Sequence, residues 1–455
     1  MHFDLILKNG TLVIPGTGLV DASVAVTGGR IAALLAPGQI ATAVRVIDCK
    51  GKHVFPGVID PHTHIGFGAK EADFLTESRS AALGGVTGMM TFHRSDDLAL
   101  STGPWREAGE ARSIIDFGFH FGVTSRAHVE TLAENAARFG VTSIKVYLMY
   151  KGAAGAAKGF GEVDDALLFR ALQAGAKIPG AVVGVHCENT EVIPVFREPL
   201  REAGRDDLKA WDEQSPGFLE TENVFRVCWF GEKTGCPVNI VHMSAAESLD
   251  LVRRLRRPGR APIHVETCAH YLSLSHDDAS GSLAKVNPPL RSQSDIDALW
   301  EGVRLGEIST IGSDHVPRKA ATKEGGIWNA SAGFPGIATL LPVLLDEGWH
   351  RRGVGLDVLA AATSANVADL YNLAGRGRIA PGYSADFAIV DLDGETLVDP
   401  DQLESHSDYT PWAGRKLKGA VTATVLKGRL IAEGGKILPG IEAGGEYIFR
   451  TAGKA

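Results

Sequence analysis

Two histidines one residue apart are the first side chains in the chain that could do chemistry. His62 and His64 follow the apolar run VFPGVID (54–60), which has the composition of a buried strand. Because side chains alternate along an extended chain, both imidazoles point to the same side. Two neutral imidazoles aimed at one point make half of a metal site. Two ordinary histidines at a strand end remain the simpler interpretation of this pair alone.

Other apolar segments carry titratable side chains at corresponding places. Lys145 lies in TSIKVYLMY, His186 ends AVVGVH, His242 ends VNIVH, and Asp314 ends ISTIGSD. Taken singly, each has an ordinary interpretation: a buried hydrogen-bonded histidine, a lysine that reaches solvent, or a helix N-cap. Together they place four histidines, a lysine and a carboxylate at the same end of several expected strands. This pattern indicates one shared metal-binding site.

The segments that must position these residues alternate between apolar, β-branched runs and amphipathic helical stretches. Strands are expected near 54–60, 85–92, 115–123, 141–148, 181–187, 238–243, 261–268 and 308–313. Helices are expected over 71–83, 126–139, 164–176, 245–257 and 294–306. Such alternation predicts βα units around a parallel sheet, and eight of them predict an α/β fold of the (β/α)8 barrel (TIM barrel) type. A doubly wound open sheet is disfavoured because no G-x-G-x-x-G follows the first strand.

Both ends of the chain have a different pattern. Residues 1–53 and 379–455 contain short apolar segments separated by Asn-Gly, Pro-Gly and Gly-Gly turns. The N-terminal stretch is too thin to hold a core alone. We therefore expect the two ends to pair into one small β-sandwich domain that flanks a barrel formed by residues 54–378.

Composition excludes several classes of partner. The 455 residues carry 46 basic and 54 acidic side chains, a net charge of −8 without the basic footprint of a nucleic-acid-binding protein. Five scattered cysteines form no CxxC pair, which predicts a reducing, cytoplasmic setting. The first residues lack the pattern of a signal peptide, and no apolar run is long enough for a membrane span. Neither nucleic acid nor a membrane is an expected partner.

Seven motifs are similar to those of the amidohydrolase superfamily, and the similarity runs over essentially the whole chain. It is greatest with the cyclic-amidase branch, which contains hydantoinases, dihydropyrimidinases, allantoinases and dihydroorotases. The motifs are PGVIDPHTH, SIKVYLMYKG, VHCEN, VHMS, ETCAHYL, KVNPPLR and GSDH. The resemblance implies two divalent metal ions, with Zn²⁺ as first choice and Mn²⁺ or another ion as the alternative. The ligands that it implies are His62, His64, Lys145, His186, His242 and Asp314.

The resemblance also implies a modified lysine and a reaction. An ammonium beside two cations would be repelled, so Lys145 is expected to be carboxylated by CO2 to an anionic carbamate that bridges the metals. The metals would make hydroxide available near neutral pH for attack on a ring amide carbonyl. Asp314 would carry the proton to the leaving nitrogen, and Tyr150 would donate a hydrogen bond to the oxyanion. The expected partners are a small cyclic amide and further copies of the chain, in a tetramer or dimer.

The motifs divide over the identity of the ring. Dihydroorotases resemble one another in an arginine shortly after the second histidine, where this chain has Ile65, Gly66 and Phe67, so that activity is disfavoured. Tyr150 and the following KG favour a hydantoinase or dihydropyrimidinase, which would release an N-carbamoyl amino acid. ETCAHYL and KVNPPLR are closer to allantoinases, which keeps the opening of allantoin to allantoate as the alternative.

Several further residues are candidates for contact with the substrate. Asn287 stands where hydantoinases commonly have a serine that contacts the ring through its backbone, and Ala332 stands where they commonly have asparagine. The expected pocket walls are Phe67, His93, Phe160 and Trp328. Such a pocket, with aromatic walls and little fixed charge, predicts a neutral ring with an apolar substituent.

Two other classes of protein share parts of this pattern. A non-catalytic scaffold relative would lack metal ligands, whereas all six are present here. A mononuclear deaminase of the same superfamily would lack the lysine of the fourth strand, which this chain has as Lys145. Both are disfavoured.

Overall fold

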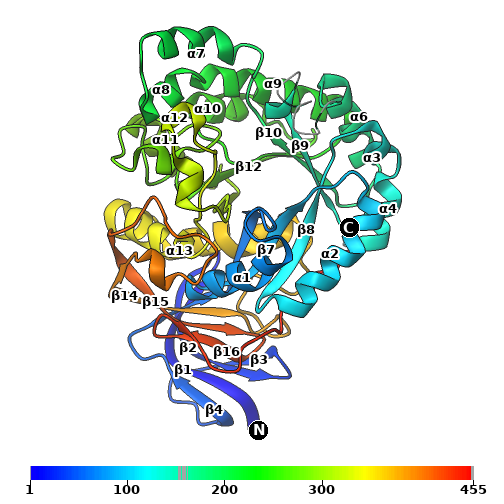
Figure 1. The fold of residues 1–455 in the computed structure, drawn as a ribbon. Coiled ribbons are helices and arrows are strands. Elements are labelled where there is room, and N and C mark those ends of the chain that lie inside the picture. The colour runs from blue at the N-terminus through cyan, green and yellow to red at the C-terminus, as the bar shows by residue number, and fades with distance from the viewer. Residues whose placement is uncertain (1, 152–154, 156–159, 161, 452–455) are drawn as a thin grey trace.

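A computed structural model describes residues 2–151, 155, 160 and 162–451. Two sheets organise the chain: an eight-stranded parallel barrel, and a nine-stranded sheet built from both chain ends, which lies at the bottom of Figure 1. The predicted (β/α)8 barrel with a β unit from both chain ends is confirmed. Of the KG that follows Tyr150, Gly152 lies outside the described residues.

The barrel strands follow one another in sequence order, and each pairs in parallel with its neighbour. They are β6 (Val58–Thr63), β7 (Val86–His93), β8 (Asp116–Gly122), β9 (Ser143–Tyr147), β10 (Val182–His186), β11 (Val238–Ile240), β12 (Ile263–Cys268) and β13 (Thr310–Gly312). A parallel bridge between Thr63 and His315 joins the last strand to the first. The backbone N–H of His64 also donates to the carbonyl of His315, at 2.8 Å. The barrel is therefore closed by residues that lie next to the candidate ligands in sequence: Thr63 follows His62, and His315 follows Asp314.

Helices cover the outside of the barrel (Figure 1). They are α1 (Asp73–Leu83), α2 (Leu98–Arg112), α3 (Arg126–Glu130), α4 (Leu132–Phe139), α6 (Asp165–Gly175), α7 (Ile193–Glu202), α8 (Leu208–Glu213), α9 (Gly217–Thr234), α10 (Ala246–Leu255), α11 (Gln293–Arg304), α12 (Gly326–Asn329), α13 (Leu340–Leu344), α14 (Leu356–Ala360) and α15 (Asn366–Leu370). Asp97, Asp164 and Ser292 cap α2, α6 and α11 by accepting from backbone N–H groups of the first turn. The single helix expected over 126–139 is divided at Thr131, which separates α3 from α4.

The chain ends form one continuous sheet. Its strands are β1 (His2–Ile14), β2 (Gly18–Thr27), β3 (Arg30–Leu35), β4 (Thr42–Asp48), β5 (His53–Pro56), β14 (Phe387–Leu397), β15 (Lys416–Leu426), β16 (Arg429–Glu433) and β17 (Lys436–Ile437). β5 lies between β1 and β14 and so joins the N-terminal strands to the C-terminal ones. Apolar side chains from both halves, such as Leu5, Val24, Phe387 and Val425, share one buried core.

The first barrel strand differs from its sequence-based expectation. The run 54–60 was expected to be one strand, but it is two: β5 pairs in the sheet of the chain ends, and β6 begins the barrel at Val58. Gly57 separates them. A Cβ at Gly57 would lie 2.1 Å from Oγ1 of Thr87, so the chain can pass from one sheet to the other only with a glycine there.

The last described residues return to the barrel. The backbone of Phe117 in β8 is hydrogen-bonded to residues 446 and 448, and the hydroxyl of Tyr447 donates to the carbonyl of Phe139 at 2.8 Å. Arg450 is buried, and its Nη1 donates to Oγ of Ser143 at 2.7 Å. Residues 446–450 accordingly lie against the barrel and not beside the N-terminal strands (Figure 1).

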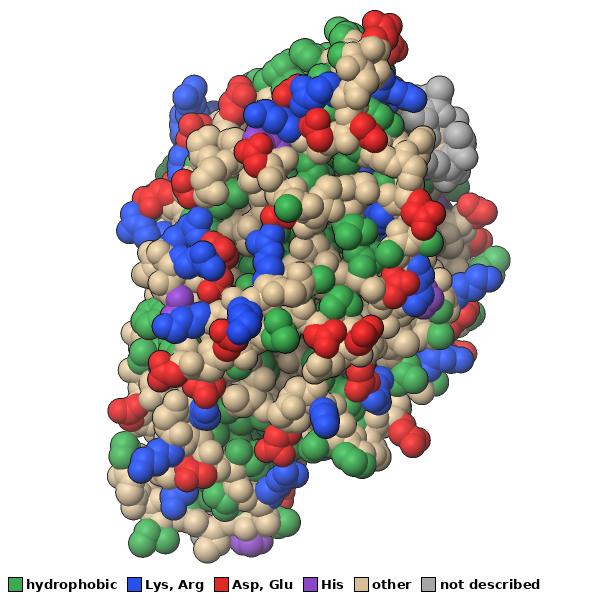
Figure 2. All heavy atoms as spheres, turned by 60° about the vertical axis from the view of Figure 1, so that its left-hand side comes forward, with side chains coloured by type: hydrophobic (Ala, Val, Ile, Leu, Met, Phe, Trp, Pro, Cys, Tyr) green, Lys and Arg blue, Asp and Glu red, His purple; other side chains and the backbone are tan. Residues whose placement is uncertain are grey.

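The surface seen in Figure 2 mixes acidic and basic side chains without a broad patch of either sign. Within the described part of the chain, no helix is both long enough and apolar enough to cross a bilayer.

Candidate metal centre and active-site pocket

Three candidate ligands converge where β6 meets the end of β13. Nε2 of His64 lies 3.0 Å from Oδ1 of Asp314, and Nε2 of His62 lies 3.2 Å from the same oxygen. One ligand atom from each of the three residues lies within 4.8 Å of the others. The alternation of side chains in extended backbone thus brings both imidazoles to one side, as the spacing predicts. A single cation could contact all three residues.

The electrostatics of this group fit a cation. Burial by itself lowers the pKa of His62, but the carboxylates of Asp314 and Glu266 raise it to about 9. For Asp314 the effects are reversed. Burial by itself raises the pKa of this carboxyl group, but His62 and His64 hold it well below its usual range. Nε2 of His62 lies 3.2 Å from Oδ1 of Asp314 but makes no hydrogen bond with any described residue. Positive charge is therefore favoured at this point, and a metal ion would supply it in place of the imidazole proton.

His186 and His242 form a second pair beside the first. They lie at the ends of β10 and β11, with ring centroids 4.4 Å apart, and the ring of His242 lies 5.2 Å from that of His62. Nε2 of His186 is 2.6 Å from Oε2 of Glu188, which fixes the orientation of the ring. Nδ1 of His242 is buried without a hydrogen-bond partner in the described part of the chain.

Two of the candidate ligands have unusual backbone conformations. His242 has φ +42° and Asp314 has φ +49°, in the left-handed region of backbone conformation that residues other than glycine seldom adopt. Residues held in this region cost on the order of 1–3 kcal/mol each and persist where surrounding structure enforces them. For Asp314, the enforcing structure is the barrel seam, where Oδ1 of the buried Asp60 accepts from the backbone N–H of Ser313.

Lys145 is a buried amine without a counter-ion. It lies in β9, is 1% exposed, and its Nζ is 4.9 Å from the ring centroid of Phe92 and 5.4 Å from that of Tyr147. Among the described residues, no carboxylate lies within ion-pair distance of it. Burial lowers the pKa of this amine to about 8. An uncompensated ammonium is costly in such a place, whereas a neutral amine is a nucleophile.

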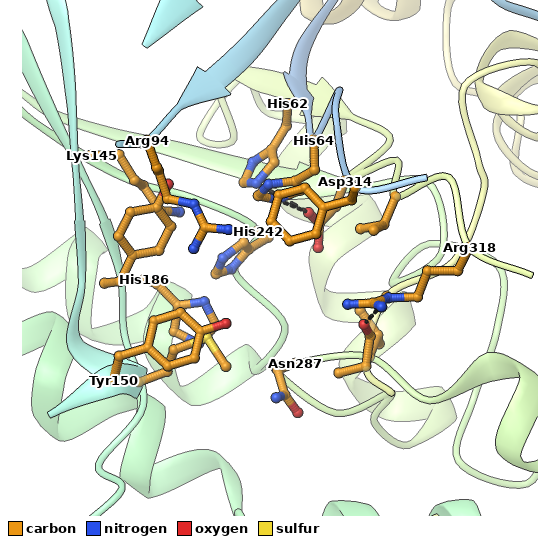
Figure 3. Close-up of a pocket in the computed structure, with 17 residues that line it drawn as sticks. His62, His64, Arg94, Lys145, Tyr150, His186, His242, Asn287, Asp314 and Arg318 are labelled. Atoms are coloured by element: carbon orange, nitrogen blue, oxygen red, sulfur yellow. Dashed lines mark hydrogen bonds and ion pairs between the residues drawn. The ribbon is translucent and has the colours of Figure 1, made fainter. Parts of the chain in front are cut away.

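All six candidate ligands line one cavity of about 550 Å³, counted to its mouth. Figure 3 shows their side chains pointing into it, with Tyr150 beside His186 and Asn287 at the bottom of the view. Four of the predicted substrate contacts, Tyr150, Asn287, Ala332 and Phe67, line this cavity as well. The structure therefore brings the predicted ligands and most of the predicted contacts to one place.

Three of the predicted pocket walls lie elsewhere. His93 and Phe160 line a neighbouring cavity, where Nε2 of His93 is 2.8 Å from Oγ of Ser101. Trp328 turns away from the metal pocket, packs against Trp211, and donates from Nε1 to the carbonyl of Arg205 at 2.7 Å. The imidazole of His93 therefore faces that neighbouring cavity and not the candidate metal ligands.

Comparison with known proteins decides the family. Residues 53–431 match the Amidohydrolase family. The chain belongs to the amidohydrolase family. It is 33% identical to an allantoinase of Rubrobacter xylanophilus over 96% of both chains, and 31% identical to an allantoinase of Escherichia coli K12 over 99% of both.

Solved structures extend this likeness to the whole fold. An L-hydantoinase (dihydropyrimidinase) from Arthrobacter aurescens superimposes with a TM-score of 0.90 at 30% identity, covering 98% of this chain and 100% of its own. A dihydropyrimidinase from Brevibacillus agri NCHU1002 gives a TM-score of 0.88 at 28% identity, covering 98% of both chains. These relatives are consistent with the cyclic-amidase branch of the family. This amidohydrolase is therefore a hydrolase of cyclic amides.

Two arginines in the pocket of this amidohydrolase were missed by sequence reasoning. Arg94 directly follows β7, and Arg318 lies four residues after Asp314. Both line the cavity, so the expectation of little fixed charge is wrong. Sequence could have signalled Arg94, because it stands at the carboxyl end of a predicted strand, where barrel enzymes place their functional side chains.

Two basic side chains, Arg318 and Lys323, hold the two loops that carry Asn287 and Ala332. Nε of Arg318 donates to the carbonyl of Ala332 at 2.9 Å. Lys323 is buried, and its Nζ donates to the carbonyls of Lys285 and Ser331 at 3.0 and 2.7 Å. Burial, with the charges of Arg318 and Lys285, lowers the pKa of Lys323 to about 6. A neutral amine at this position thus ties together the backbones of the loops on the far side of the pocket.

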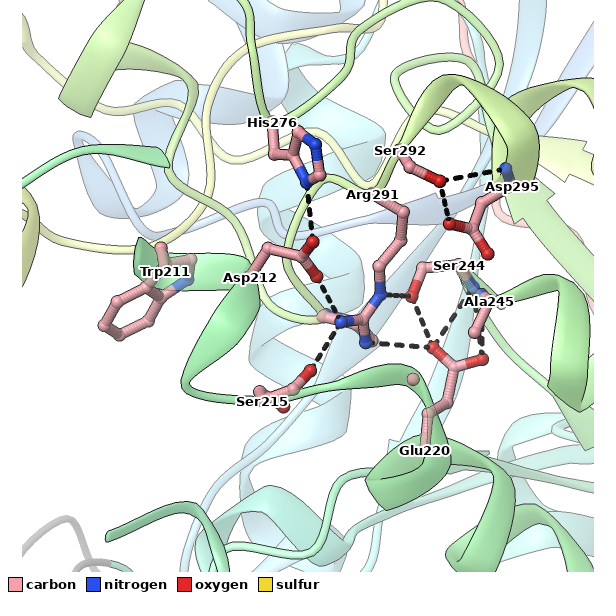
Figure 4. A network of polar contacts seen from close by, with 12 residues as sticks. Trp211, Asp212, Ser215, Glu220, Ser244, Ala245, His276, Arg291, Ser292 and Asp295 are labelled. Carbon is pink, nitrogen blue, oxygen red and sulfur yellow. Dashed lines mark hydrogen bonds and ion pairs between the residues drawn. The ribbon is translucent and has the colours of Figure 1, made fainter. Parts of the chain in front are cut away.

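Figure 4 shows a buried polar network around Arg291, and its contacts continue through Ser215 to Glu188, the partner of His186. Nη1 of Arg291 is 2.6 Å from Oδ1 of Asp212, and its Nε donates to Oγ of Ser244 at 3.0 Å. Nη1 also donates to the carbonyl of Ser215, whose hydroxyl donates to Oε1 of Glu188 at 2.9 Å. The KVNPPLR motif therefore contributes its arginine to a chain of contacts that ends at a candidate metal ligand.

Proposed function

We propose that this amidohydrolase hydrolyses the ring amide of a hydantoin or dihydropyrimidine to an N-carbamoyl amino acid. The observation that supports it best is the convergence of six candidate ligands in one cavity that Tyr150 also lines. Two divalent ions, Zn²⁺ by preference and Mn²⁺ as the alternative, would supply a hydroxide near neutral pH and polarise the amide carbonyl when bound.

The donor set divides naturally into two groups. His62, His64 and Asp314 would hold one ion, because their ligand atoms lie within 4.8 Å of one another. His186 and His242 would hold the other. Lys145 lines the same cavity, and its carboxylation by CO2 would give the anion that a site with two cations needs. The missing counter-ion and the lowered pKa of this amine support that modification.

Asp314 and Tyr150 are the proposed catalytic residues. The carboxylate of Asp314 faces the cavity with a pKa well below its usual range, so it is ionised and can take up a proton and deliver it to the leaving ring nitrogen. The ring of Tyr150 is stacked on Phe160 with centroids 4.2 Å apart, which orients the phenol toward the pocket. Its hydroxyl would donate to the oxyanion that develops on the attacked carbonyl.

Asn287 and Ala332 are the proposed ring contacts on the far side. The carbonyl of Ala332 already accepts from Arg318 at 2.9 Å, so one of its lone pairs remains for a ring N–H. Trp211 fixes the other loop, because its Nε1 donates to the carbonyl of Val286 at 3.0 Å. Both contact points are therefore held in place before a substrate arrives.

Allantoinase is the second candidate function. It is favoured by the allantoinases of 31–33% identity that cover nearly the whole chain, whereas the solved structures with TM-scores of 0.88–0.90 are hydantoinases and dihydropyrimidinases. A dihydroorotase is less favoured, because no arginine follows His64 closely. A non-catalytic scaffold is less favoured still, since every candidate ligand is present.

We also infer a cytoplasmic homo-oligomer, either a dimer or a tetramer. All five cysteines are buried and unpaired, which suits a reducing compartment. Phe225 and Trp229 stack on each other on α9 and remain 46% and 42% exposed, as is typical of side chains that a partner covers. Light scattering of the purified protein would measure its mass in solution.

A substrate panel tests the proposal. Metal-loaded enzyme is offered hydantoin, 5-substituted hydantoins, dihydrouracil, allantoin and dihydroorotate, and loss of the ring amide absorbance is followed. Turnover of hydantoins or dihydrouracil is expected. Rapid opening of allantoin without hydantoin activity would make the enzyme an allantoinase. No turnover of any ring by protein that holds less than one equivalent of metal would favour the scaffold.

A further inference from the structure

Arg94 forms part of the wall between the metal pocket and a second, larger cavity. Together with Phe67 it lines both, and their volumes are about 550 and 1240 Å³. In Figure 3 its guanidinium points into the space between Lys145 and the histidines. A group attached to a ring held at the metal ligands would therefore meet Arg94 before it reached the larger cavity.

Aromatic rings surround this guanidinium. Its Cζ lies 4.8 Å from the ring centroid of Phe67, 5.2 Å from that of Phe160 and 5.3 Å from that of Tyr147. Cation–π contacts of this kind hold the planar group in one orientation but do not neutralise its charge. The fork of N–H donors is thus oriented and still needs acceptors.

No described carboxylate neutralises Arg94. The acidic side chains that line the larger cavity, Glu71 and Asp96, make no ion pair with it within 4 Å, in contrast to the pairing of the buried Arg291 with Asp212. An arginine is charged at every physiological pH. Its charge also adds to that of the proposed metals, so the pocket gains positive charge that its own side chains leave uncompensated.

We propose that Arg94 binds a carboxylate on the ring substituent, so that the substrate is a cyclic amide with an anionic side chain. The proposal rests on the ring-opening function proposed above. A carboxylate fits because its two oxygens match the planar fork of a guanidinium in paired, charge-assisted hydrogen bonds. The neutral, apolar substituent that the sequence suggested would leave this arginine without a partner.

Arg318 provides a matched control. It is the other arginine of the pocket, lies on the opposite wall in Figure 3, and likewise has no carboxylate partner within 4 Å among the described residues. Its Nε, however, is bonded to the carbonyl of Ala332, so it positions the loop that contacts the ring. Loss of Arg318 is expected to slow the opening of every ring alike. Loss of Arg94 should slow only the opening of rings that carry a carboxylate substituent.

The test compares two pairs of substrates on metal-loaded enzyme. One pair is 5-carboxymethylhydantoin and its neutral isostere 5-carbamoylmethylhydantoin, and the other is dihydroorotate and dihydrouracil. The wild type is expected to prefer the acid of at least one pair by about ten-fold or more in kcat/KM, the usual effect of a charged hydrogen-bond pair. Arg94→Met should bring that ratio to about one, mainly through KM, and Arg318→Met should leave it unchanged.

The results separate this proposal from the proposed function. If rings open but the wild type prefers the neutral members of both pairs, or if the preference survives Arg94→Met, Arg94 does not read a carboxylate although the function stands. If no ring opens, the function fails, and calorimetry with N-carbamoylaspartate and N-carbamoylasparagine still reports on Arg94. Ten-fold tighter binding of the acid that is lost in Arg94→Met supports the proposal, and equal binding overturns it. Arg94→Gln replaces the methionine variant if that variant does not fold.

Discussion

Nδ1 of His62 lies 2.6 Å from Oε1 of Glu266, a carboxylate of β12 that is wholly buried. The imidazole therefore donates from Nδ1 and turns Nε2 toward Asp314 and the cavity. Glu266 fixes both the tautomer and the orientation of the ring without lining the pocket itself.

Replacement of Glu266 should weaken metal binding. Glu266→Gln keeps an acceptor for Nδ1 but removes the charge, and Glu266→Ala removes both. We expect losses of metal affinity of about 10–100-fold, larger for alanine, as is usual when the partner of a ligating histidine is lost. Competition with a chelator of known affinity measures the effect. Wild-type affinity in both variants would show that the orientation of His62 does not depend on Glu266.

Lys145→Ala should abolish ring opening and lower the metal content from two equivalents to one or less. The reason is that the proposed carbamate is the only donor expected to bridge both ions. Lys177→Ala, at an exposed position after α6, is the control and should change neither quantity. Elemental analysis of protein equilibrated in metal buffer provides the measurement, and full metal content with full turnover in Lys145→Ala would contradict a binuclear site.

Tyr150→Phe should lower kcat by about 10²–10³-fold, the usual effect of losing one oxyanion donor. Metal content and KM should change little, because phenylalanine keeps the ring that stacks on Phe160 at 4.2 Å. Steady-state kinetics on the best substrate of the panel separates the two parameters. An unchanged kcat would assign Tyr150 to packing alone.

Arg291→Met should destabilise the fold strongly. The guanidinium is 3% exposed and lies 2.6 Å from Asp212 and 3.9 Å from the buried Glu220, so its removal leaves the carboxylate of Glu220 without a counter-ion. Breaking a buried pair in this way costs about 3–5 kcal/mol of unfolding free energy. Arg304→Met removes an exposed pair with Glu301 and should change the unfolding free energy far less, because solvent screens such a pair. Denaturant unfolding of both variants measures the difference, and similar small losses would mean that the network of Figure 4 contributes little.

Lys323 should make stability depend on pH. Its folded pKa is about 6 against 10.5 for an unperturbed lysine, so between these values the folded chain binds fewer protons than the unfolded chain. The free energy of unfolding then rises with pH by up to about 1.4 kcal/mol per pH unit between these two pKa values. As pH falls toward 6, the fold loses this stability, because the unfolded chain binds a proton that the folded chain does not. Lys323→Met removes the titration, so the variant gains on the wild type as pH falls. Unfolding midpoints from pH 6.5 to 9.5 measure this, and parallel curves would contradict it.

The barrel could be predicted because its strands and their ends leave a strong pattern in sequence. The eight predicted strands overlap β6–β13, and the candidate ligands share one cavity because parallel strands bring their carboxyl ends together. The division at Gly57 was not predictable from apolarity, since β5 and β6 are both buried and differ only in the sheet they join.

The pocket walls were less predictable for a physical reason. His93 and Arg94 are neighbours at the end of β7, and both line the larger cavity, but only Arg94 also lines the metal pocket. The sequence does not reveal which of the two reaches the metals, because that depends on how the strand is rotated about its axis. Glu188 and Glu266 were missed because acidic residues are usually solvent-exposed, and only the fold shows that they orient His186 and His62.

The return of the chain end to the barrel has a consequence for synthesis. Arg450 bonds Ser143 at the start of β9, the strand that carries Lys145, although 307 residues separate the two. When β8 and β9 leave the ribosome, the guanidinium that fills the space between them has not yet been translated. We therefore expect the contact between β8 and β9 to be completed only when Arg450 arrives. Amides near Ser143 should gain protection from hydrogen exchange only after residues near 450 emerge, which makes completion of the metal site one of the last events in folding.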